Sequence, residues 1–372
     1  MIAGTAAALL AAVLFLPQTA RAVSARSALV QDAVSGRILY EKDADRQSLI
    51  ASTTKIMTAL IVCQQCNVLD RMRIPAEAVG IEGSSMYLRE GEILTVQELL
   101  YGLMLASGND AAVALAIYCG GTVEGFAQLM NDKARYLGLK DTNFVNPHGL
   151  DHPEHYSTAR DLAVLAAYAM EDPVFRKTVS TKSVRIGERQ LSNHNRLLWQ
   201  VEGADGVKTG FTKAAGRILV SSAVRSGRRL VVVTIDDGDD WRDHTALYEQ
   251  GFSRYRMERI VTKGDCLGYL PVLGGQQETV PIVAAEDFSY PIADGEKVYI
   301  RFSQKGFVYA PVDQNGDAGL AYICLGGKVI GKIGVGNFLA GQKWKPTNEI
   351  FGILPMILGS IYVTAGALLI GV

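Results

Sequence analysis

Three short groups of polar residues in this sequence combine side chains that together could attack a carbonyl group. In chain order they supply a hydroxyl with an amine, a hydroxyl with an amide, and a cation with a glycine: Ser52-Thr53-Thr54-Lys55, Ser107-Gly108-Asn109 and Lys208-Thr209-Gly210. Each group alone is a short polar word of the kind that arises by chance. Their ordered combination is a much more specific signal, and it predicts one serine-based acyl-transfer site.

Ser52 and Lys55 are three positions apart, so a helix places both side chains on one face. A serine hydroxyl is a poor nucleophile until a base removes its proton. A lysine amine becomes that base when burial or a second cation, here Lys208, lowers its pKa. The apolar run IMTALIVC after Lys55 predicts a buried helix, which favours a functional lysine over a solvated residue in a first helical turn.

Ser107 and Asn109 lie between two apolar stretches, LLYGLMLA and AAVALAIYC. Polar groups in such a position are expected inside a core, where they need hydrogen-bond partners. We expect Ser107 to relay a proton to the leaving amine, and Asn109 to bond both Lys55 and a substrate amide. An ordinary turn is the alternative for these three residues taken alone.

Lys208-Thr209-Gly210 lies in the segment GVKTGFT, whose pattern predicts a strand. Lys208 and Thr209 could bind a terminal carboxylate. Gly210 would let an extended peptide approach and pair along the strand edge. The backbone N–H groups of Ser52 and Phe211 are expected to form an oxyanion hole.

The elements that must position these groups change along the chain. Two apolar runs around Ser35-Gly36 predict a hairpin, and helices follow, beginning with capping signals at 95–98 and 158–161. GVKTGFT, RILVSSAV and RLVVVTID then predict three strands, the last two joined by a turn at Ser226-Gly227. We expect residues 26–257 to form an α+β catalytic domain in which helices cover one antiparallel five-stranded sheet.

Residues 260–342 follow a different pattern, in which turn signals recur between short β-branched runs. These signals are Gly274-Gly275, Asp294-Gly295, Lys305-Gly306, Asn315-Gly316 and Gly326-Gly327. Such spacing predicts a small all-β domain, either a sandwich or a barrel. Residues 350–372 carry no charge and are long enough to predict a C-terminal membrane anchor helix, with a buried or interfacial helix as the alternative.

The N-terminal residues predict export. Residues 2–16 are apolar and uncharged, and Ala20-Arg21-Ala22 follows as a cleavage signal, so residues 1–22 are interpreted as a signal peptide rather than a short anchor. The expected location is the outer face of the cytoplasmic membrane. A net charge of −1 argues against a nucleic-acid partner. Among five cysteines, Cys63 and Cys66 are expected inside a helix, as core or free thiols rather than a redox or metal motif.

The sequence resembles the low-molecular-mass penicillin-binding proteins that act as D-alanyl-D-alanine carboxypeptidases. Beyond the three groups, the resemblance is carried by SSMYLREGE (84–92), NPHGLDHPEHYSTARD (146–161), NHNRLL (193–198) and DGVKTGFT (205–212). It covers residues 26–257, and less sharply the β-rich segment to 342. It implies a β-lactamase/transpeptidase-like catalytic fold, a C-terminal β-domain and a hydrophobic membrane tail.

The resemblance also implies an activity. The resemblance implies that Ser52 is the nucleophile and Lys55 its base. It also implies that Ser107 and Asn109 relay a proton and that Lys208 is an electrostatic clamp. The substrate would be the peptidoglycan stem pentapeptide, which loses its terminal D-Ala through an acyl-enzyme without any cofactor. A β-lactam antibiotic would acylate the same serine. Some members bind the substrate's carboxylate with an arginine near the end of the catalytic domain. Arg242 is a candidate counterpart, but it is not included among the predicted site residues.

Three alternatives remain at this stage. A class A β-lactamase would need a Glu-x-x-Leu-Asn word for deacylation, and none occurs between Asn109 and Lys208. A β-lactam sensor that acylates without deacylating would keep the same residues. A metal hydrolase could use His148, His152 and His155, although the prolines among them prevent the helical ligand spacing.

Overall fold

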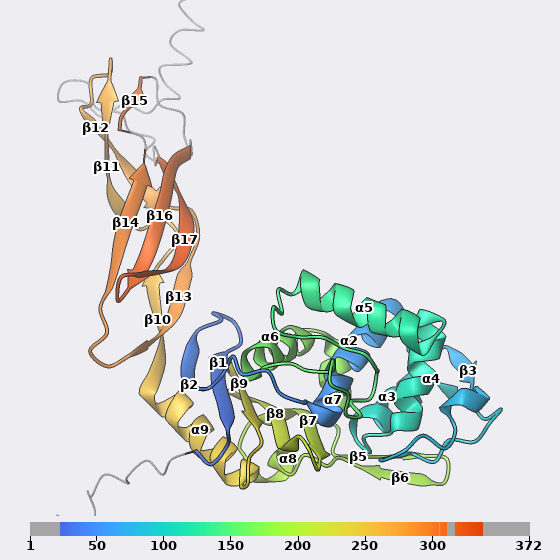
Figure 1. The fold of residues 1–372 in the computed structure, drawn as a ribbon. Coiled ribbons are helices and arrows are strands. Elements are labelled where there is room, and N and C mark those ends of the chain that lie inside the picture. Colours follow the sequence, from blue (N-terminus) through green and yellow to red (C-terminus); the bar gives the residue numbers. More distant parts are fainter. Residues whose placement is uncertain (1–22, 305, 311–316, 338–372) are drawn as a thin grey trace, which may run out of the picture. The chain divides into compact units, whose positions relative to one another are not determined.

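The computed structural model describes residues 23–304, 306–310 and 317–337. They divide into two compact units, one ending at Arg254 and the other beginning at Tyr255 (Figure 1). The predicted signal peptide and the predicted anchor at 350–372 lie outside the described residues. Within the described ranges, no single helix is long and apolar enough to cross a membrane. Two helices joined at an 82° bend, Asn109–Gly120 and Val123–Tyr136, reach that length and composition only together.

The first unit is built from one five-stranded sheet, a set of helices and two short strand pairs. The sheet contains β1 (Ser27–Asp32), β2 (Ile38–Lys42), β7 (Ala204–Thr212), β8 (Gly216–Arg225) and β9 (Arg228–Ile235). The short pairs are β3 (Arg71–Arg73) with β4 (Ile93–Thr95), and β5 (Ser183–Ile186) with β6 (Arg189–Ser192). The helices are η2 (Ala51–Thr54), α2 (Lys55–Gln65), η3 (Ala76–Ala78), α3 (Val96–Met104), α4 (Asn109–Gly120), α5 (Val123–Tyr136), α6 (Ala159–Ala169), α7 (Pro173–Ser180), α8 (Leu197–Gln200) and α9 (Asp240–Arg254).

The strand order β2-β1-β9-β8-β7 joins the N-terminal hairpin to the three late strands, and every neighbouring pair is antiparallel. The predicted sheet is therefore confirmed. The turn between β8 and β9 has positive φ at both Ser226 (49°) and Gly227 (77°), as a tight hairpin turn of this hand requires. β7 is an edge strand, so its outer side is open to another chain segment.

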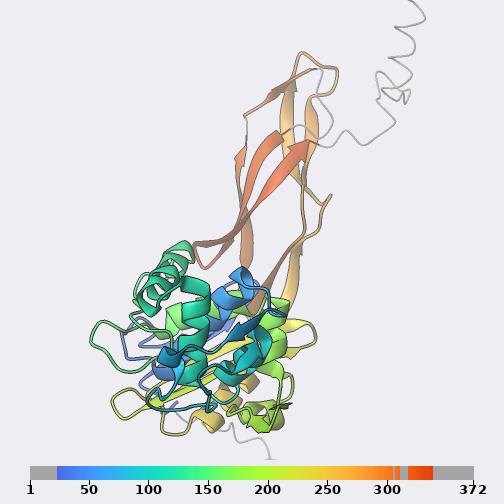
Figure 2. The same cartoon turned by 90° about the vertical axis from the view of Figure 1, so that its right-hand side faces the viewer.

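The two faces of the sheet pack against different helices. Along β9, Val231, Val233 and Ile235 join the core that includes α2 and α6, because alternate residues of a strand point to one face. The intervening residues face α9, where Thr234 Oγ1 lies 2.9 Å from His244 Nε2. The sheet is thus enclosed between α9 and the remaining helices (Figure 1 and Figure 2).

The helix starts follow the capping signals. Glu98 N donates to Thr95 Oγ1 at 3.2 Å, and Thr95 N donates to Glu98 Oε2 at 2.7 Å, so the predicted capping box of α3 is present. Thr158 Oγ1 accepts from Asp161 N in the same way at the start of α6. In α4 the N-cap residue is Gly108, which has no side chain to cap the helix, and the first eight residues of the helix are buried. Packing therefore contributes more than an N-cap to the helix that carries Asn109.

The cysteine expectation needs one correction. α2 ends at Gln65, so Cys63 lies in its last turn and Cys66 stands just beyond its end, rather than both lying well inside a helix. All five cysteines are free thiols. Burial raises the pKa of the Cys63 thiol, so this group is held in its neutral form.

The second unit is entirely β in its described residues, which confirms the predicted all-β domain. Its strands are β10 (Tyr255–Val261), β11 (Cys266–Leu273), β12 (Thr279–Ala284), β13 (Phe288–Ala293), β14 (Val298–Gln304), β15 (Val308–Tyr309), β16 (Asp317–Leu325) and β17 (Lys328–Asn337). β10 pairs with β13, and the other six form a sheet in the order β14-β16-β17-β12-β11-β15. Inward-facing apolar side chains such as Leu270, Ile282 and Ile323 make its separate core.

One buried ion pair ties the first hairpin to the rest of the sheet. Arg228 Nε on β9 donates to Asp32 Oδ2 at 2.7 Å, and the two side chains are only 8% and 1% exposed. The other oxygen, Asp32 Oδ1, accepts from Ser35 N at 2.9 Å and from Ser35 Oγ at 2.8 Å in the β1–β2 turn. Removal of this carboxylate would take the negative charge away from a buried cation that otherwise contacts the neutral Gly251 O.

We expect Asp32→Ala to lower the free energy of unfolding by roughly 3–5 kcal/mol, measured by urea denaturation followed by circular dichroism. The matched control is Arg26→Gln, which breaks the half-exposed pair of Arg26 with Asp236 and should cost less than about 1 kcal/mol. Equal losses in the two variants would contradict the importance given to the buried pair.

Candidate active site

A cleft of about 700 Å³ runs along the edge of β7 and brings the predicted residues together. Five of them line it, namely Ser52, Ser107, Thr209, Gly210 and Phe211. The other three, Lys55, Asn109 and Lys208, are buried, with at most 4% of each residue exposed. All eight residues of the sequence-based prediction therefore belong to one site, although they come from η2, α2, the start of α4 and β7.

Ser52 does not lie on an α-helix, as the spacing suggested, but on the 3-10 turn η2 that precedes α2. Lys55 follows this turn directly as the first residue of α2, and Lys55 Nζ lies 3.0 Å from Ser52 Oγ.

The turn is held by a chain of hydrogen bonds from a histidine. Thr54 Oγ1 donates to Ala51 O at 2.8 Å and lies 2.7 Å from His155 Nε2. Val145 N donates to His155 Nδ1 at 3.2 Å, so the ring proton must be on Nε2, which then donates to Thr54. Burial lowers the pKa of His155 to about 4, which keeps this ring neutral.

Ala51 has a positive φ of 44°, which is rare for a residue with a side chain. Gly149 packs directly on it, and a Cβ at Gly149 would lie 1.8 Å from Ala51 O. Only glycine fits there. The same loop brings His148 O to 2.7 Å from Lys55 Nζ.

His148 and His155 of this loop each have hydrogen-bond partners within the protein. Burial, assisted by the Lys55 charge, lowers the pKa of His148 to about 3. Across the ranges that the structure describes, no group of three or more His, Cys, Asp or Glu residues is arranged to hold a metal ion.

The amine of Lys55 has three polar neighbours. Besides Ser52 Oγ, they are Asn109 Oδ1 and His148 O, each at 2.7 Å. The last two can only accept hydrogen bonds. A neutral amine has two N–H donors and one lone pair, so these two acceptors use both donors. The lone pair then remains for the hydroxyl proton of Ser52.

Two effects favour that neutral form. Burial lowers the pKa of Lys55 well below its ordinary value, the charge of Lys208 lowers it further, and Asp110 acts in the opposite direction. Lys208 is also fully buried, and desolvation lowers its own pKa to about 7. Burial therefore destabilises the charged form of both lysines, and the positive charge of one further disfavours the charged form of the other.

Asn109 is oriented by contacts on both sides of its amide. Its Nδ2 donates to Glu82 O at 2.5 Å, so its Oδ1 must face Lys55. Asp110, the next residue, accepts from Ser85 Oγ at 2.6 Å and from Leu88 N at 3.0 Å. Asp110 and the structural role of His155 are not predicted by any local pattern, although both residues lie in or beside stretches that carry the family resemblance.

β7 approaches Ser52 closely because of Gly210. A Cβ at this position would lie 3.2 Å from Ile50 O and 3.3 Å from Ser52 N, tighter than ordinary contacts. Ser52 and the strand that follows Gly210 can therefore present their backbone N–H groups to one substrate oxygen. The arrangement brings together a serine hydroxyl, a buried amine of lowered pKa and an edge strand, which are the groups that serine acyl transfer uses.

Comparison with known proteins agrees with this chemistry. Residues 15–239 match the family model described as D-alanyl-D-alanine carboxypeptidase, and residues 255–345 match that of the penicillin-binding protein 5 C-terminal domain. The chain is 31% identical over 322 residues to D-alanyl-D-alanine carboxypeptidase DacF of Bacillus subtilis, covering 82% of this chain and 83% of the relative. It is 34% identical over 306 residues to DacD of Escherichia coli, covering 77% and 78%.

A solved structure shares both parts of the fold. Penicillin-binding protein 5 from Haemophilus influenzae superposes with a TM-score of 0.75 at 30% identity, covering 89% of this chain and 98% of that one. The family model spans more than half of the chain, and the relatives align over most of their own length. The chain therefore belongs to the D-alanyl-D-alanine carboxypeptidase family of serine peptidases and is a hydrolase.

Proposed function

We propose that this carboxypeptidase works through an acyl-enzyme on Ser52, with the neutral amine of Lys55 as the general base. The observation that carries the proposal is the 3.0 Å approach of Lys55 Nζ to Ser52 Oγ. The other two neighbours of that amine can only accept, so in the neutral form they take its two N–H groups and leave its lone pair for the hydroxyl of Ser52.

In the first step, Lys55 Nζ takes the proton from Ser52 Oγ as the oxygen bonds to the carbonyl carbon of the penultimate D-Ala. The backbone N–H groups of Ser52 and Phe211 stabilise the negative oxygen of the tetrahedral intermediate. The extended peptide pairs with the free edge of β7 beside Gly210. Lys208 and Thr209 act on the substrate's carboxylate end as an electrostatic clamp.

In the second step, the amide C–N bond breaks and the terminal D-Ala leaves. Its amine receives the proton from Lys55 through the hydroxyl of Ser107, and Asn109 holds both Lys55 and a substrate amide. Water then attacks the ester carbonyl as Lys55 takes a proton from it. The ester C–O bond breaks, Lys55 returns the proton to Ser52 Oγ, and the shortened peptide is released as the acid.

The setting of this chemistry is proposed from the sequence. Residues 1–22 act as a signal peptide, residues 26–257 as the exported catalytic domain, residues 260–342 as the β-rich domain, and residues 350–372 as the anchor on the outer face of the cytoplasmic membrane. The substrate is then the stem pentapeptide of peptidoglycan. β-Lactam antibiotics, which resemble its terminal dipeptide, acylate Ser52.

Ser52→Ala is expected to abolish release of D-Ala from a pentapeptide ending in D-Ala-D-Ala, because the nucleophile is lost. Fluorescent penicillin should label the wild-type chain at Ser52 and leave the variant unlabelled, as peptide mapping by mass spectrometry would check. The same substitution at Ser85, which supports the loop beside the site, leaves the nucleophile in place and serves as the control. A label on another residue refutes the assignment, and stable labelling without D-Ala release would indicate a sensor.

The two lysines predict the dependence of kcat/KM on pH. The value of kcat/KM should rise with pH as Lys55 loses its proton, at a pH well below 10.5. It should fall at a pH of about 7, where Lys208 loses the positive charge that attracts the substrate carboxylate. Lys208→Arg should remove the alkaline fall, since a guanidinium stays charged. Initial rates of D-Ala release across the pH range would test this, and an unchanged alkaline limb in Lys208→Arg would argue against the clamp.

A further inference from the structure

The cleft contains a guanidinium that the steps above do not use. Arg217 lies near the start of β8 and lines the same cleft as Ser52 and Thr209. Its side chain is 45% exposed, so it can meet a ligand. A carboxypeptidase acts at the free end of a peptide, and that end is a carboxylate.

The register of the sheet places Arg217 beside the predicted substrate-binding residues. Thr209 pairs with Leu219, and Phe211 pairs with Arg217, across the antiparallel strands β7 and β8. Directly paired residues share a face of a sheet, and so do alternate residues along one strand. Thr209, Phe211 and Arg217 therefore project from one face, next to the edge where the peptide would lie.

A buried carboxylate fixes the direction of this guanidinium. Arg217 Nη2 donates to Asp240 Oδ1 at 2.5 Å, and Nε donates to Asp240 Oδ2 at 3.2 Å. The Asp240 side chain is only 4% exposed, and the indole of Trp241 lies under the guanidinium at 5.7 Å. Among the described residues, Nη1 has no hydrogen-bond partner. An anchored fork with an unused donor suits a planar carboxylate.

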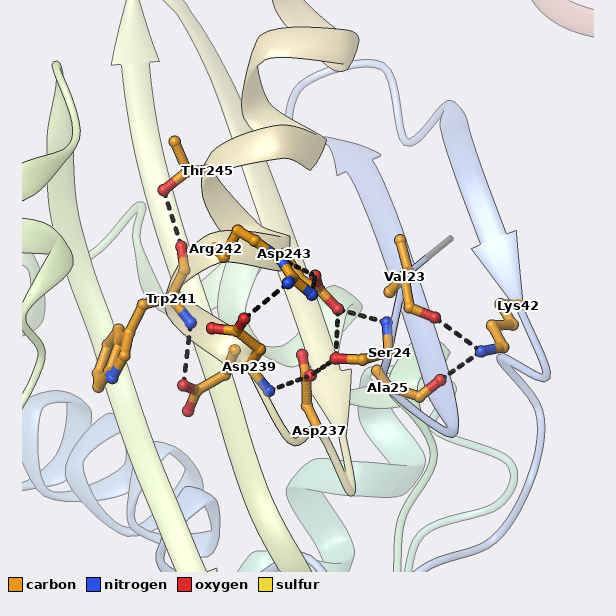
Figure 3. Close-up of polar contacts among 11 residues, drawn as sticks. Val23, Ser24, Ala25, Lys42, Asp237, Asp239, Trp241, Arg242, Asp243 and Thr245 are labelled. Carbon is orange, nitrogen blue, oxygen red and sulfur yellow. Dashed lines mark hydrogen bonds and ion pairs between the residues drawn. The ribbon is translucent and has the colours of Figure 1, made fainter. Parts of the chain in front are cut away.

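Arg242, the arginine suggested by the family resemblance, is directed elsewhere. Its Nη1 lies 2.8 Å from Asp239 Oδ2, and its Nη2 lies 3.1 Å from Asp243 Oδ1. Asp243 also binds Ser24 near the start of the described chain. Figure 3 shows Trp241 and Arg242 leaving the first turn of α9 in different directions. Arg242 is not among the residues that line the cleft.

We propose that Arg217 binds the terminal carboxylate of the substrate beside Thr209, and that Asp240 is a positioning residue for it. This inference rests on the proposed function of the same cleft. Arg217 thereby makes the enzyme selective for a free C-terminus over a blocked one. Arg196 also lines the cleft and is exposed, but it has no carboxylate partner in the described part of the chain to fix its direction.

The test compares two substrates that differ only at the C-terminus: a peptide ending in D-Ala-D-Ala as the free acid, and the same peptide as the C-terminal amide. Release of D-Ala or of D-alaninamide is quantified by chromatography for wild type, Arg217→Gln and the control Arg242→Gln. For Arg217→Gln we expect kcat/KM on the acid to fall roughly 10- to 100-fold, as for a lost charge-assisted hydrogen bond. The value on the amide should change little, and Arg242→Gln should match wild type on both substrates.

Two further variants extend the test if Arg217→Gln folds poorly. Arg217→Lys should recover part of the preference for the acid, because it restores the charge without the fork. Asp240→Asn should weaken the preference while leaving the rate on the amide unchanged. Thermal unfolding reports whether each variant keeps its fold. The extent of labelling by fluorescent penicillin at completion reports whether its nucleophile is intact.

The outcomes separate this inference from the proposed function. If wild type releases D-Ala but Arg217→Gln loses nothing, or loses equally on acid and amide, Arg217 is not the carboxylate-binding residue. The same conclusion follows if Arg242→Gln or Arg196→Gln removes the preference for the acid instead. A wild-type enzyme that releases no D-Ala above the Ser52→Ala background overturns the proposed function itself.

Discussion

The burial of one lysine amine is the constraint on which this site depends. Lys55 is fully buried, faces a second buried lysine, and contacts two oxygens that can only accept hydrogen bonds. Desolvation and like charge both penalise its ammonium form, so the pKa falls and a basic lone pair becomes available. The same contacts decide where that lone pair points. In the neutral amine, Asn109 Oδ1 and His148 O take the two N–H groups, so the lone pair points toward Ser52. The lowered pKa and the hydrogen-bond geometry therefore both favour Lys55 as the base for Ser52.

Much of the surrounding architecture maintains this geometry. Gly149 and Gly210 let two chain segments approach η2 closely, since a Cβ would clash with Ala51 O at Gly149 and would be tight against Ile50 O at Gly210. His155, kept neutral by burial, holds Thr54 and thereby the turn that presents Ser52. The sheet places β7 at an edge, so the strand that carries Lys208 and Thr209 can contact a peptide while its other side remains paired with β8. The ion pair of Arg228 with Asp32 joins the central strand β9 to β1 and so ties the N-terminal hairpin into the same sheet.

The sequence predicted more of the site than is usual because each group had a local signal. The three motifs, the capping box at Thr95 and the turn at Ser226-Gly227 follow from short-range rules, and the structure brings the motif residues together. Sequence reasoning placed Ser52 on a helix, since it could not distinguish a 3-10 turn from an α-helical one at the same spacing. The roles of Asp110, His155 and Arg217 were missed. These residues contact Leu88, Thr54 and Asp240, respectively, each at least 22 positions away in the chain. Such partnerships depend on tertiary contacts that no local pattern encodes.

The proposed mechanism requires a neutral Lys55 amine in the free enzyme, and direct titration of that amine tests this requirement. Nuclear magnetic resonance of lysine-labelled enzyme, with the Lys55 signal assigned by its loss in Lys55→Arg, would follow its chemical shift with pH. We predict a pKa well below the ordinary 10.5, and a higher pKa in Lys208→Met, where the neighbouring positive charge is gone. An ordinary pKa that does not respond to Lys208 would contradict the mechanism, whatever the activity of the enzyme.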